Sequence, residues 1–159
     1  NTTTHVFQNA NNTYTPQSAS YDPDTGLMNI SIPKTTKTVS SATYNTTSGD
    51  MVLTIGTNHG LTTDDTIKIK PNSLSFSCDM NTLGQVTKSY PRAEGANTTS
   101  GADYAYDTSL AITAVDAAAG TITVNVNGGQ GAISNSNSHT FVSATANGIL
   151  VGNHFQDGE

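Results

Sequence analysis

Apolar and polar residues alternate with a period of two in eight short segments of this chain, a pattern typical of strands that bury one face. None of these segments has the 3.6-residue period of an amphipathic helix. The pattern predicts an all-β fold, namely a small antiparallel β-sandwich or barrel-like domain with an extended N-terminal β arm. The predicted strands are Met28–Ile32, Met51–Ile55, Thr66–Lys70, Leu74–Cys78, Leu110–Val115, Thr121–Val126, His139–Ser143 and Ile149–Val151.

Glycine and proline positions predict how some of these strands are connected. Residues 116–120 form a five-residue connection that ends in Gly120, which predicts a hairpin over residues 110–126. Pro71 and Asn72 predict a tight turn between the two strands that flank them.

The chain contains an internal repeat at an offset of 23 residues. Ser18–Ile32 aligns with Ser41–Ile55, with six identities among fifteen positions. Each copy has a short Ser-Ala-x-Tyr strand, a turn that contains glycine and a second alternating strand, which predicts two similar hairpins. A fainter similarity relates His5–Ala10 to His139–Ala144, so the start of the chain resembles the end of a preceding unit.

The sequence divides into an N-terminal arm over residues 1–40, which includes one hairpin-like repeat unit, and a sandwich-like domain over 41–159. Prolines interrupt the arm, which therefore has little apolar area to bury alone. We expect the arm to pair with an exposed sheet edge of a neighbouring subunit. Packing of the arm on its own domain is the alternative. The residues predicted for this subunit interface are Val6, Phe7, Met28, Ile30 and Ile32.

A long segment without a strand pattern, residues 80–109, is expected to form a loop. Loops of this length in compact domains are usually functional or disordered. Tyrosine and arginine are enriched at interfaces, so Tyr90, Arg92, Tyr104 and Tyr106 are candidates for contact with a partner. The alternative is a loop that folds back over its own sheet, with the tyrosines covering the core edge.

Composition and charge restrict the class of partner. The chain has 27 Thr, 16 Ser, 16 Asn and 14 Gly among 159 residues, with 6 basic and 12 acidic residues and a net charge of −6. Nucleic acid is not expected as a partner, because a phosphate-backbone footprint needs clustered Lys and Arg. The longest apolar runs fall far short of the ~20 residues of a membrane span, so no membrane contact is predicted. The first residue is Asn1, which indicates a processed product or an excerpt of a longer protein.

Candidate catalytic and metal-binding groups lack supporting motifs. The four histidines, at positions 5, 59, 139 and 154, are at least fifteen residues apart and accompany no nucleophile motif. Asp22 to Gly26 resembles the opening of a calcium loop, but the aligned copy, Asn45 to Gly49, has lost both carboxylates, which favours a turn. We therefore predict no catalytic residue, metal or cofactor.

Several motifs in a fixed order resemble repeat units of structural proteins in tailed marine phages that infect cyanobacteria. The resemblance covers about residues 41–146; the segment 94–103 is extended relative to the family pattern, and residues after 146 lie outside it. The resemblance implies a virion structural role and brings no active site with it. The motifs are Asn58–Thr62, Asp65–Ile69, Asn72–Met80, Lys88–Arg92, Tyr106–Val115, Thr121–Val126 and His139–Ala144.

Three function hypotheses follow. The first is a phage virion protein, a tail, fibre, neck or capsid-decorating subunit in the extracellular particle, which assembles with itself and with other virion proteins and also contacts a host-surface glycan. The second is a bacterial extracellular adhesin-like β-repeat protein that binds glycans or cell surfaces. The third, a polysaccharide depolymerase, would need two carboxylates in a cleft, for which Asp103 and Asp107 are the candidates.

Overall fold

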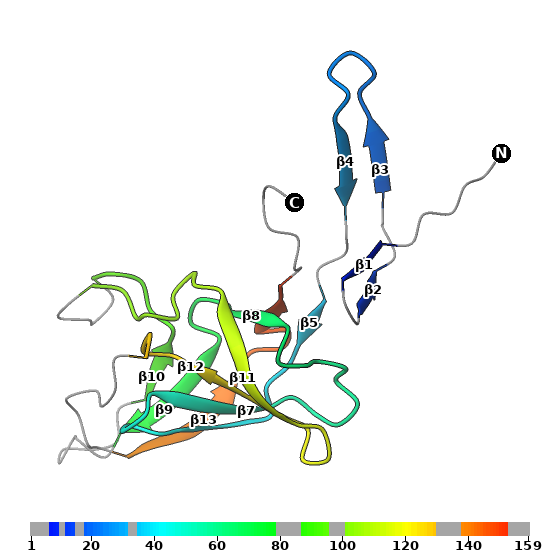
Figure 1. Ribbon diagram of the computed structural model, residues 1–159. Coiled ribbons are helices and arrows are strands. Elements are labelled where there is room, and N and C mark those ends of the chain that lie inside the picture. The colour runs from blue at the N-terminus through cyan, green and yellow to red at the C-terminus, as the bar shows by residue number, and fades with distance from the viewer. Residues whose placement is uncertain are drawn as a thin grey trace.

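The fold is seen in a computed structural model that describes residues 7–9, 12–14, 18–31, 35–78, 87–95, 101–129 and 138–152. Within these ranges the chain forms strands β1 to β14 and no helix. Every strand pair is antiparallel. Most strands together form one body, and a long hairpin projects from it (Figure 1). The predicted all-β fold is confirmed.

The larger sheet of the body has seven strands, in the order β5-β14-β8-β11-β12-β7-β6. The predicted hairpin over residues 110–126 is confirmed, because β11 pairs with β12 and Val115 lies opposite Ile122. The strands of this sheet are β5 (Thr36–Lys37), β6 (Ser41–Tyr44), β7 (Asp50–Thr54), β8 (Thr66–Ile69), β11 (Leu110–Asp116), β12 (Thr121–Asn125) and β14 (Ile149–Val151).

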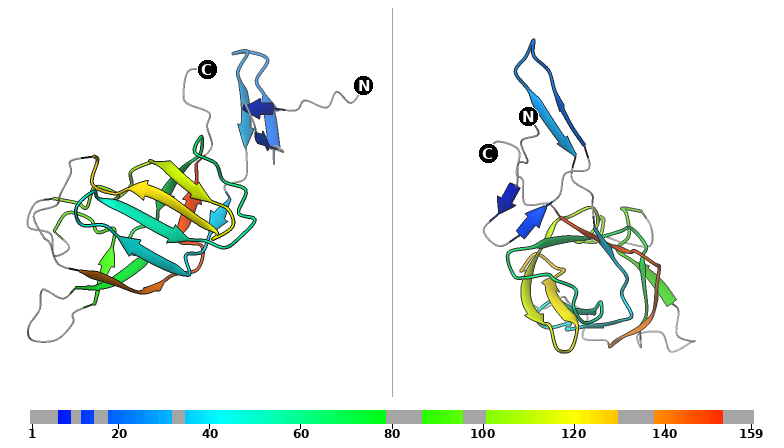
Figure 2. Two further views of the ribbon diagram at one scale, coloured as in Figure 1. Left: turned by 60° about the horizontal axis from the view of Figure 1, so that its bottom comes forward. Right: turned by 90° about the vertical axis from the view of Figure 1, so that its right-hand side faces the viewer.

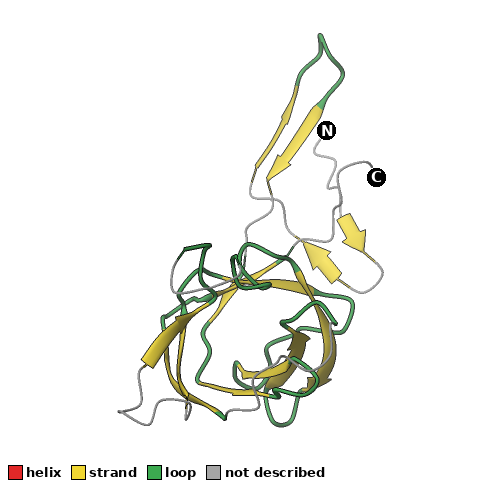
Figure 3. Ribbon diagram, turned by 90° about the vertical axis from the view of Figure 1, so that its left-hand side faces the viewer, coloured by secondary structure: helices red, strands yellow, loops and turns green. Residues whose placement is uncertain are grey.

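The smaller sheet has three strands in the order β10-β9-β13, namely β10 (Thr87–Tyr90), β9 (Leu74–Cys78) and β13 (His139–Ala144). The chain passes from β8 to β9 through the predicted turn at Pro71 and Asn72, where Asn72 has a φ of 58°. On the other side, the edge strand β6 lies beside the edge strand β13, and the rings of Tyr44 and His139 meet edge to face at 5.5 Å. In the described chain, backbone pairing does not join β6 to β13, so the body is a strongly curved sandwich rather than a closed barrel (Figure 3).

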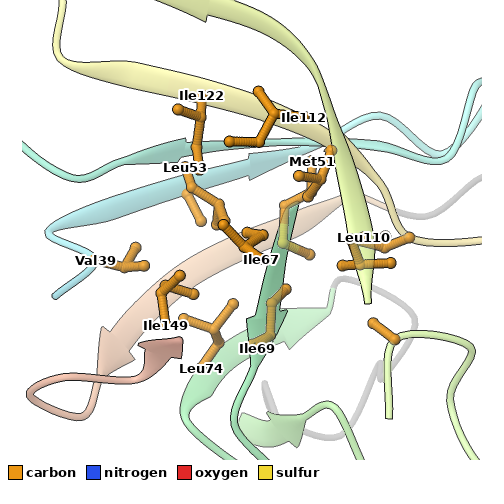
Figure 4. Close-up of a cluster of buried hydrophobic side chains, with 14 of the residues drawn as sticks. Val39, Met51, Leu53, Ile67, Ile69, Leu74, Leu110, Ile112, Ile122 and Ile149 are labelled. Carbon is orange, nitrogen blue, oxygen red and sulfur yellow. The ribbon is translucent and has the colours of Figure 1, made fainter. Parts of the chain in front are cut away.

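The core lies between the two sheets and is built mainly from residues at alternate strand positions (Figure 4). In β7 and β12, for example, Met51, Leu53, Ile122 and Val124 point inward, as the period-two pattern requires. The remaining apolar residues of the core are Val39, Ala42, Leu61, Ile67, Ile69, Leu74, Phe76, Ala105, Leu110, Ile112, Val126, Ile149 and Val151.

Two strands depart from simple alternation because each contains a bulge. The register of β11 shifts between Ile112 and Ala114, and the register of β13 shifts between Phe141 and Ser143. A bulge inserts one residue that has no direct partner on the neighbouring strand. The residue inserted in β13 is Val142, and after it Ser143 is exposed while Ala144 packs against the core, the reverse of what strict alternation from Phe141 would give.

The residues before β5 form two further two-stranded sheets. β1 (Phe7–Asn9) pairs with β2 (Asn12–Tyr14), and β3 (Ser18–Tyr21) pairs with β4 (Met28–Ser31). We call residues 18–31 the arm hairpin. It projects from the sandwich in all views (Figure 2).

All eight strands predicted from alternation are present, as are β3 and β6, the two Ser-Ala-x-Tyr strands predicted from the repeat. Four further strands were not predicted. These are β1, β2, β5 and β10. Three of them have only two or three residues, and β10 (Thr87–Tyr90) lies within the segment 80–109 that was expected to be a loop. β10 has the sequence Thr-Lys-Ser-Tyr, so its pairing with β9, rather than its own apolar pattern, makes it a strand.

Candidate functional site

The arm hairpin has one apolar face and one polar face. Because side chains alternate across a strand, the cross-strand pairs Ala19 with Ile30 and Tyr21 with Met28 lie on the same side. We call Ala19, Tyr21, Met28 and Ile30 the apolar face. The opposite side carries Ser18, Ser20 and Asn29.

Local hydrogen bonds fix the turn of the arm hairpin. The Asp22 carboxylate accepts hydrogen bonds from the backbone N–H groups of Asp24 at 2.9 Å and Thr25 at 3.4 Å. The Gly26 N–H donates to the Asp22 carbonyl at 2.8 Å, and Gly26 has a φ of 72°, which glycine adopts without strain. Hydrogen bonds from the Thr25 side chain and the Asp24 backbone lower the pKa of Asp22. The carboxylate therefore closes a turn, as predicted.

The β6–β7 hairpin of the sandwich has the same register as the arm hairpin. It pairs Ala42 with Leu53 and Tyr44 with Met51. Each of these residues lies 23 positions after its counterpart in the apolar face. The predicted repeat is therefore a repeat of three-dimensional structure.

The turn of β6–β7 also repeats the turn of the arm hairpin. The Asn45 side-chain oxygen accepts hydrogen bonds from the backbone N–H groups of Thr47 at 2.8 Å and Ser48 at 3.2 Å. The Gly49 N–H donates to the Asn45 carbonyl at 2.9 Å, and Gly49 has a φ of 76°. Asp and Asn side chains cap such turns in the same way, so the loss of the carboxylate in the second copy leaves the geometry unchanged.

The two hairpins differ in their surroundings. Met51 in β7 is 2% exposed, whereas its counterpart Met28 is 59% exposed. Tyr44 is half-buried against the core, whereas Tyr21 is 61% exposed. In the described residues, the exposed large apolar side chains are Tyr21, Leu27, Met28, Tyr104 and Val142, and three of these five belong to the arm hairpin. Of the residues whose burial is described, the arm hairpin therefore holds most of the exposed large apolar side chains.

The residues predicted for the subunit interface are placed as follows. Met28 and Ile30 lie on the apolar face of the arm hairpin. Phe7 lies in β1, opposite Tyr14 of β2. Val6 and Ile32 lie outside the described residues.

Of the loop residues predicted to contact a partner, Tyr90 turns toward its own domain. Its hydroxyl donates a hydrogen bond to the Val126 carbonyl at 3.4 Å, and its ring meets Phe76 edge to face at 6.5 Å. Burial, with a further effect of the Asp103 charge, raises the pKa of Tyr90. The side chain is therefore part of the domain's packing.

Arg92 forms a bidentate ion pair with Asp103. Its Nε and Nη2 groups donate to the two carboxylate oxygens at 3.0 Å and 3.1 Å, and its backbone N–H donates to the same carboxylate at 2.7 Å. The two side chains are only 20% and 15% exposed. This pair ties the segment after β10 to residues 101–109, where Tyr104 is 51% exposed and Tyr106 is half-buried.

Two candidate carboxylates and one ring nitrogen have structural partners. Asp103 binds Arg92, and Asp107 pairs with the Lys68 Nζ at 3.2 Å. His59 accepts the Leu61 N–H at Nδ1 at 3.0 Å, and burial together with the charge of Lys37 lowers its pKa.

In the described ranges, His, Cys, Asp and Glu form no group of three or more that could hold a metal. His5 and His154 lie outside these ranges. The same ranges contain no helix that could cross a membrane.

No protein-family model, curated protein or solved structure shows significant similarity to this chain. The resemblance to phage virion repeats therefore stays a prediction.

Sequence reasoning did not select Leu27, which is 64% exposed at the end of the turn. The repeat alignment carries the signal that would have found it. Leu27 aligns with Asp50, so the arm hairpin has an apolar residue where the sandwich hairpin has a carboxylate. Leu27 therefore adds to the exposed apolar residues of the arm hairpin.

Proposed function

We propose that this chain is a structural subunit of a tailed-phage virion that acts in particle assembly, with contact to the host surface as a second role. The observation that carries the proposal is the arm hairpin, which extends from the sandwich and exposes Tyr21, Leu27 and Met28. Contiguous exposed apolar residues mark interaction sites. The ordered motifs of residues 41–146 support a virion as the place where this interaction is used.

The arm suits assembly because its two-stranded sheets are incomplete. An isolated two-stranded hairpin is only marginally stable in water, and a third strand or a covering apolar surface stabilises it. β1–β2 and β3–β4 have no further strand beside them in the described chain. A neighbouring subunit that adds backbone hydrogen bonds or apolar cover would stabilise both molecules. The partners are other copies of this chain and other virion proteins.

Contact with the host surface draws on the loop of residues 101–109. The Arg92–Asp103 pair holds this loop against the domain, and Tyr104 remains 51% exposed. An exposed tyrosine on a fixed loop offers an apolar ring and a polar hydroxyl, which suits a glycan.

Mass spectrometry of purified virions tests the proposal. We expect the chain in intact particles at a copy number that matches a symmetric component. Its absence from intact particles would refute the virion role, and its recovery from a bacterial cell envelope would favour the adhesin-like alternative.

A truncation tests the role of the arm. β5 pairs with β14 and Val39 is buried, so a truncation that removes only the arm ends at residue 34. The shortened chain should melt cooperatively but fail to enter particles. Normal incorporation of the shortened chain would show that the arm is not the assembly element.

A further inference from the structure

We propose that a second copy of this chain covers the apolar face of the arm hairpin, and that the two hairpins pack face to face about a twofold axis. The inference rests on the proposed function, because it names the partner of the assembly arm. Its evidence is the structural repeat, the distribution of charge and the area of the face.

The repeat shows how this kind of face is normally covered. On β6–β7, the equivalent residues Ala42, Met51 and Leu53 are at most 4% exposed, because they pack on the interior of the sandwich. In each copy, β6–β7 already occupies that interior. A second copy therefore cannot offer its interior to an arm hairpin, but it does bring an equally uncovered apolar face. Two such faces can bury each other as the two sheets of a sandwich do, about 10 Å apart.

The charges of the hairpin favour a twofold arrangement. The apolar face carries no charged side chain, and residues 18–31 contain no Lys or Arg. The only charged residues, Asp22 and Asp24, lie in the turn at one end of the hairpin. A twofold axis that lies between the two faces and runs across the strands places the two turns at opposite ends, whereas an axis along the strands would bring four carboxylates together. The antiparallel isologous contact therefore avoids like-charge repulsion.

The small area of the face limits the strength of the contact. Its four side chains form a patch smaller than the roughly 800 Å² per partner of a standard interface. We therefore expect a reversible dimer of the free chain, with a dissociation constant of roughly 10 µM to 1 mM. In a particle, other contacts between the subunits would raise the effective concentration of the hairpins and strengthen the pairing.

Sedimentation equilibrium of the full 159-residue chain tests the proposal. Met28→Asp places a charge on the apolar face, and Asn29→Asp places the same charge on the polar face of the same strand as a matched control. We expect dimer formation to increase with concentration for the original chain and for Asn29→Asp, and to weaken at least tenfold for Met28→Asp. Both positions are exposed, so both variants should keep the melting temperature of the dilute original chain.

Cysteine crosslinking tests the orientation. In a Cys78→Ser background, Met28→Cys and Asn29→Cys are treated with a bismaleimide that spans about 10–15 Å, which matches the spacing of packed sheets. Met28→Cys should give a covalent dimer and Asn29→Cys should not. Equal crosslinking at both positions would indicate edge-to-edge pairing and would overturn the face-to-face contact.

Two further results would also overturn it: a chain that stays monomeric up to about 1 mM, and a Met28→Asp variant that dimerises like the original chain. These failures are distinguishable from failure of the proposed function. A monomeric chain found in virions would remove this inference and leave the virion role, whereas a dimeric chain absent from virions would do the reverse.

Discussion

The repeated hairpin allows one substitution to be compared in two environments. Met51→Ala and Met28→Ala remove the same atoms from the same register position, next to turns with the same hydrogen bonds. The intrinsic strand preference of the side chain is therefore similar in both variants. The difference that remains is burial, because Met51 is 2% exposed and Met28 is 59% exposed.

The expected magnitudes are well separated. Truncation of a buried methionine to alanine lowers the free energy of unfolding by about 2–5 kcal/mol, since apolar contacts are lost and a cavity remains. Substitution at an exposed position usually changes it by less than about 0.5 kcal/mol. In a domain of this size, 1 kcal/mol corresponds to about 2–4 °C in Tm. Met51→Ala should therefore lower Tm by roughly 4–20 °C and Met28→Ala by less than about 2 °C.

Urea unfolding at low micromolar concentration, where self-association is negligible, provides the measurement. The chain has six tyrosines and no tryptophan, so tyrosine fluorescence and circular dichroism report the transition. Equal losses in the two variants, or a loss above about 1 kcal/mol for Met28→Ala, would mean that the arm hairpin packs on its own domain in solution. Either result would refute the argument from exposure.

Three further predictions concern the sandwich itself. Asp103→Ala should lower the free energy of unfolding by about 2–4 kcal/mol in urea titrations, because it leaves the mostly buried Arg92 guanidinium without its bidentate partner; a loss below about 0.5 kcal/mol would contradict this. Gly49→Ala should lower the free energy of unfolding more than Gly26→Ala does. Both glycines have positive φ, but only at Gly49 would the added methyl group collide with a neighbouring side chain. Equal losses of unfolding free energy in the two variants would contradict the described packing. Burial raises the pKa of Tyr90, so the unfolded chain loses the hydroxyl proton at a lower pH than the folded chain does. The free energy of unfolding should therefore fall as the pH rises above about 10. Tyr90→Phe should make this decrease with pH shallower, and an unchanged decrease would be evidence against a buried hydroxyl.

The sequence predicted the strands whose inward positions are apolar, because burial on one face imposes a period of two on the residues themselves. Leu53 and Ile122 are examples, and both are fully buried where the pattern predicted a core position. β10 was not predicted, because its residues become a strand through pairing with β9, a contact that its own composition does not encode. The turn at Pro71 was predicted from local chemistry, but local chemistry does not determine that the strands on its two sides enter different sheets.

The candidate site was predictable to a similar extent. The repeat alignment implied two hairpins with one register, and the structure has them. The alignment could not show that one copy would be buried and the other exposed, because burial depends on strands distant in the sequence. The same holds for Arg92 and Asp103, eleven residues apart in a segment without periodicity, whose pairing depends on how the loop folds over the domain.

The repeat also bears on how the arm could associate without a large loss of conformational entropy. A disordered segment that folds on binding loses much of its interaction energy to ordering. The arm hairpin carries the same turn that closes β6–β7, with Asp22 in the place of Asn45 and glycine at the same left-handed position. These bonds are internal to residues 22–27 and do not require a cover on the apolar face. The turn of the hairpin is therefore organised before the arm meets a partner, and preorganisation of this kind strengthens a contact whose area is small.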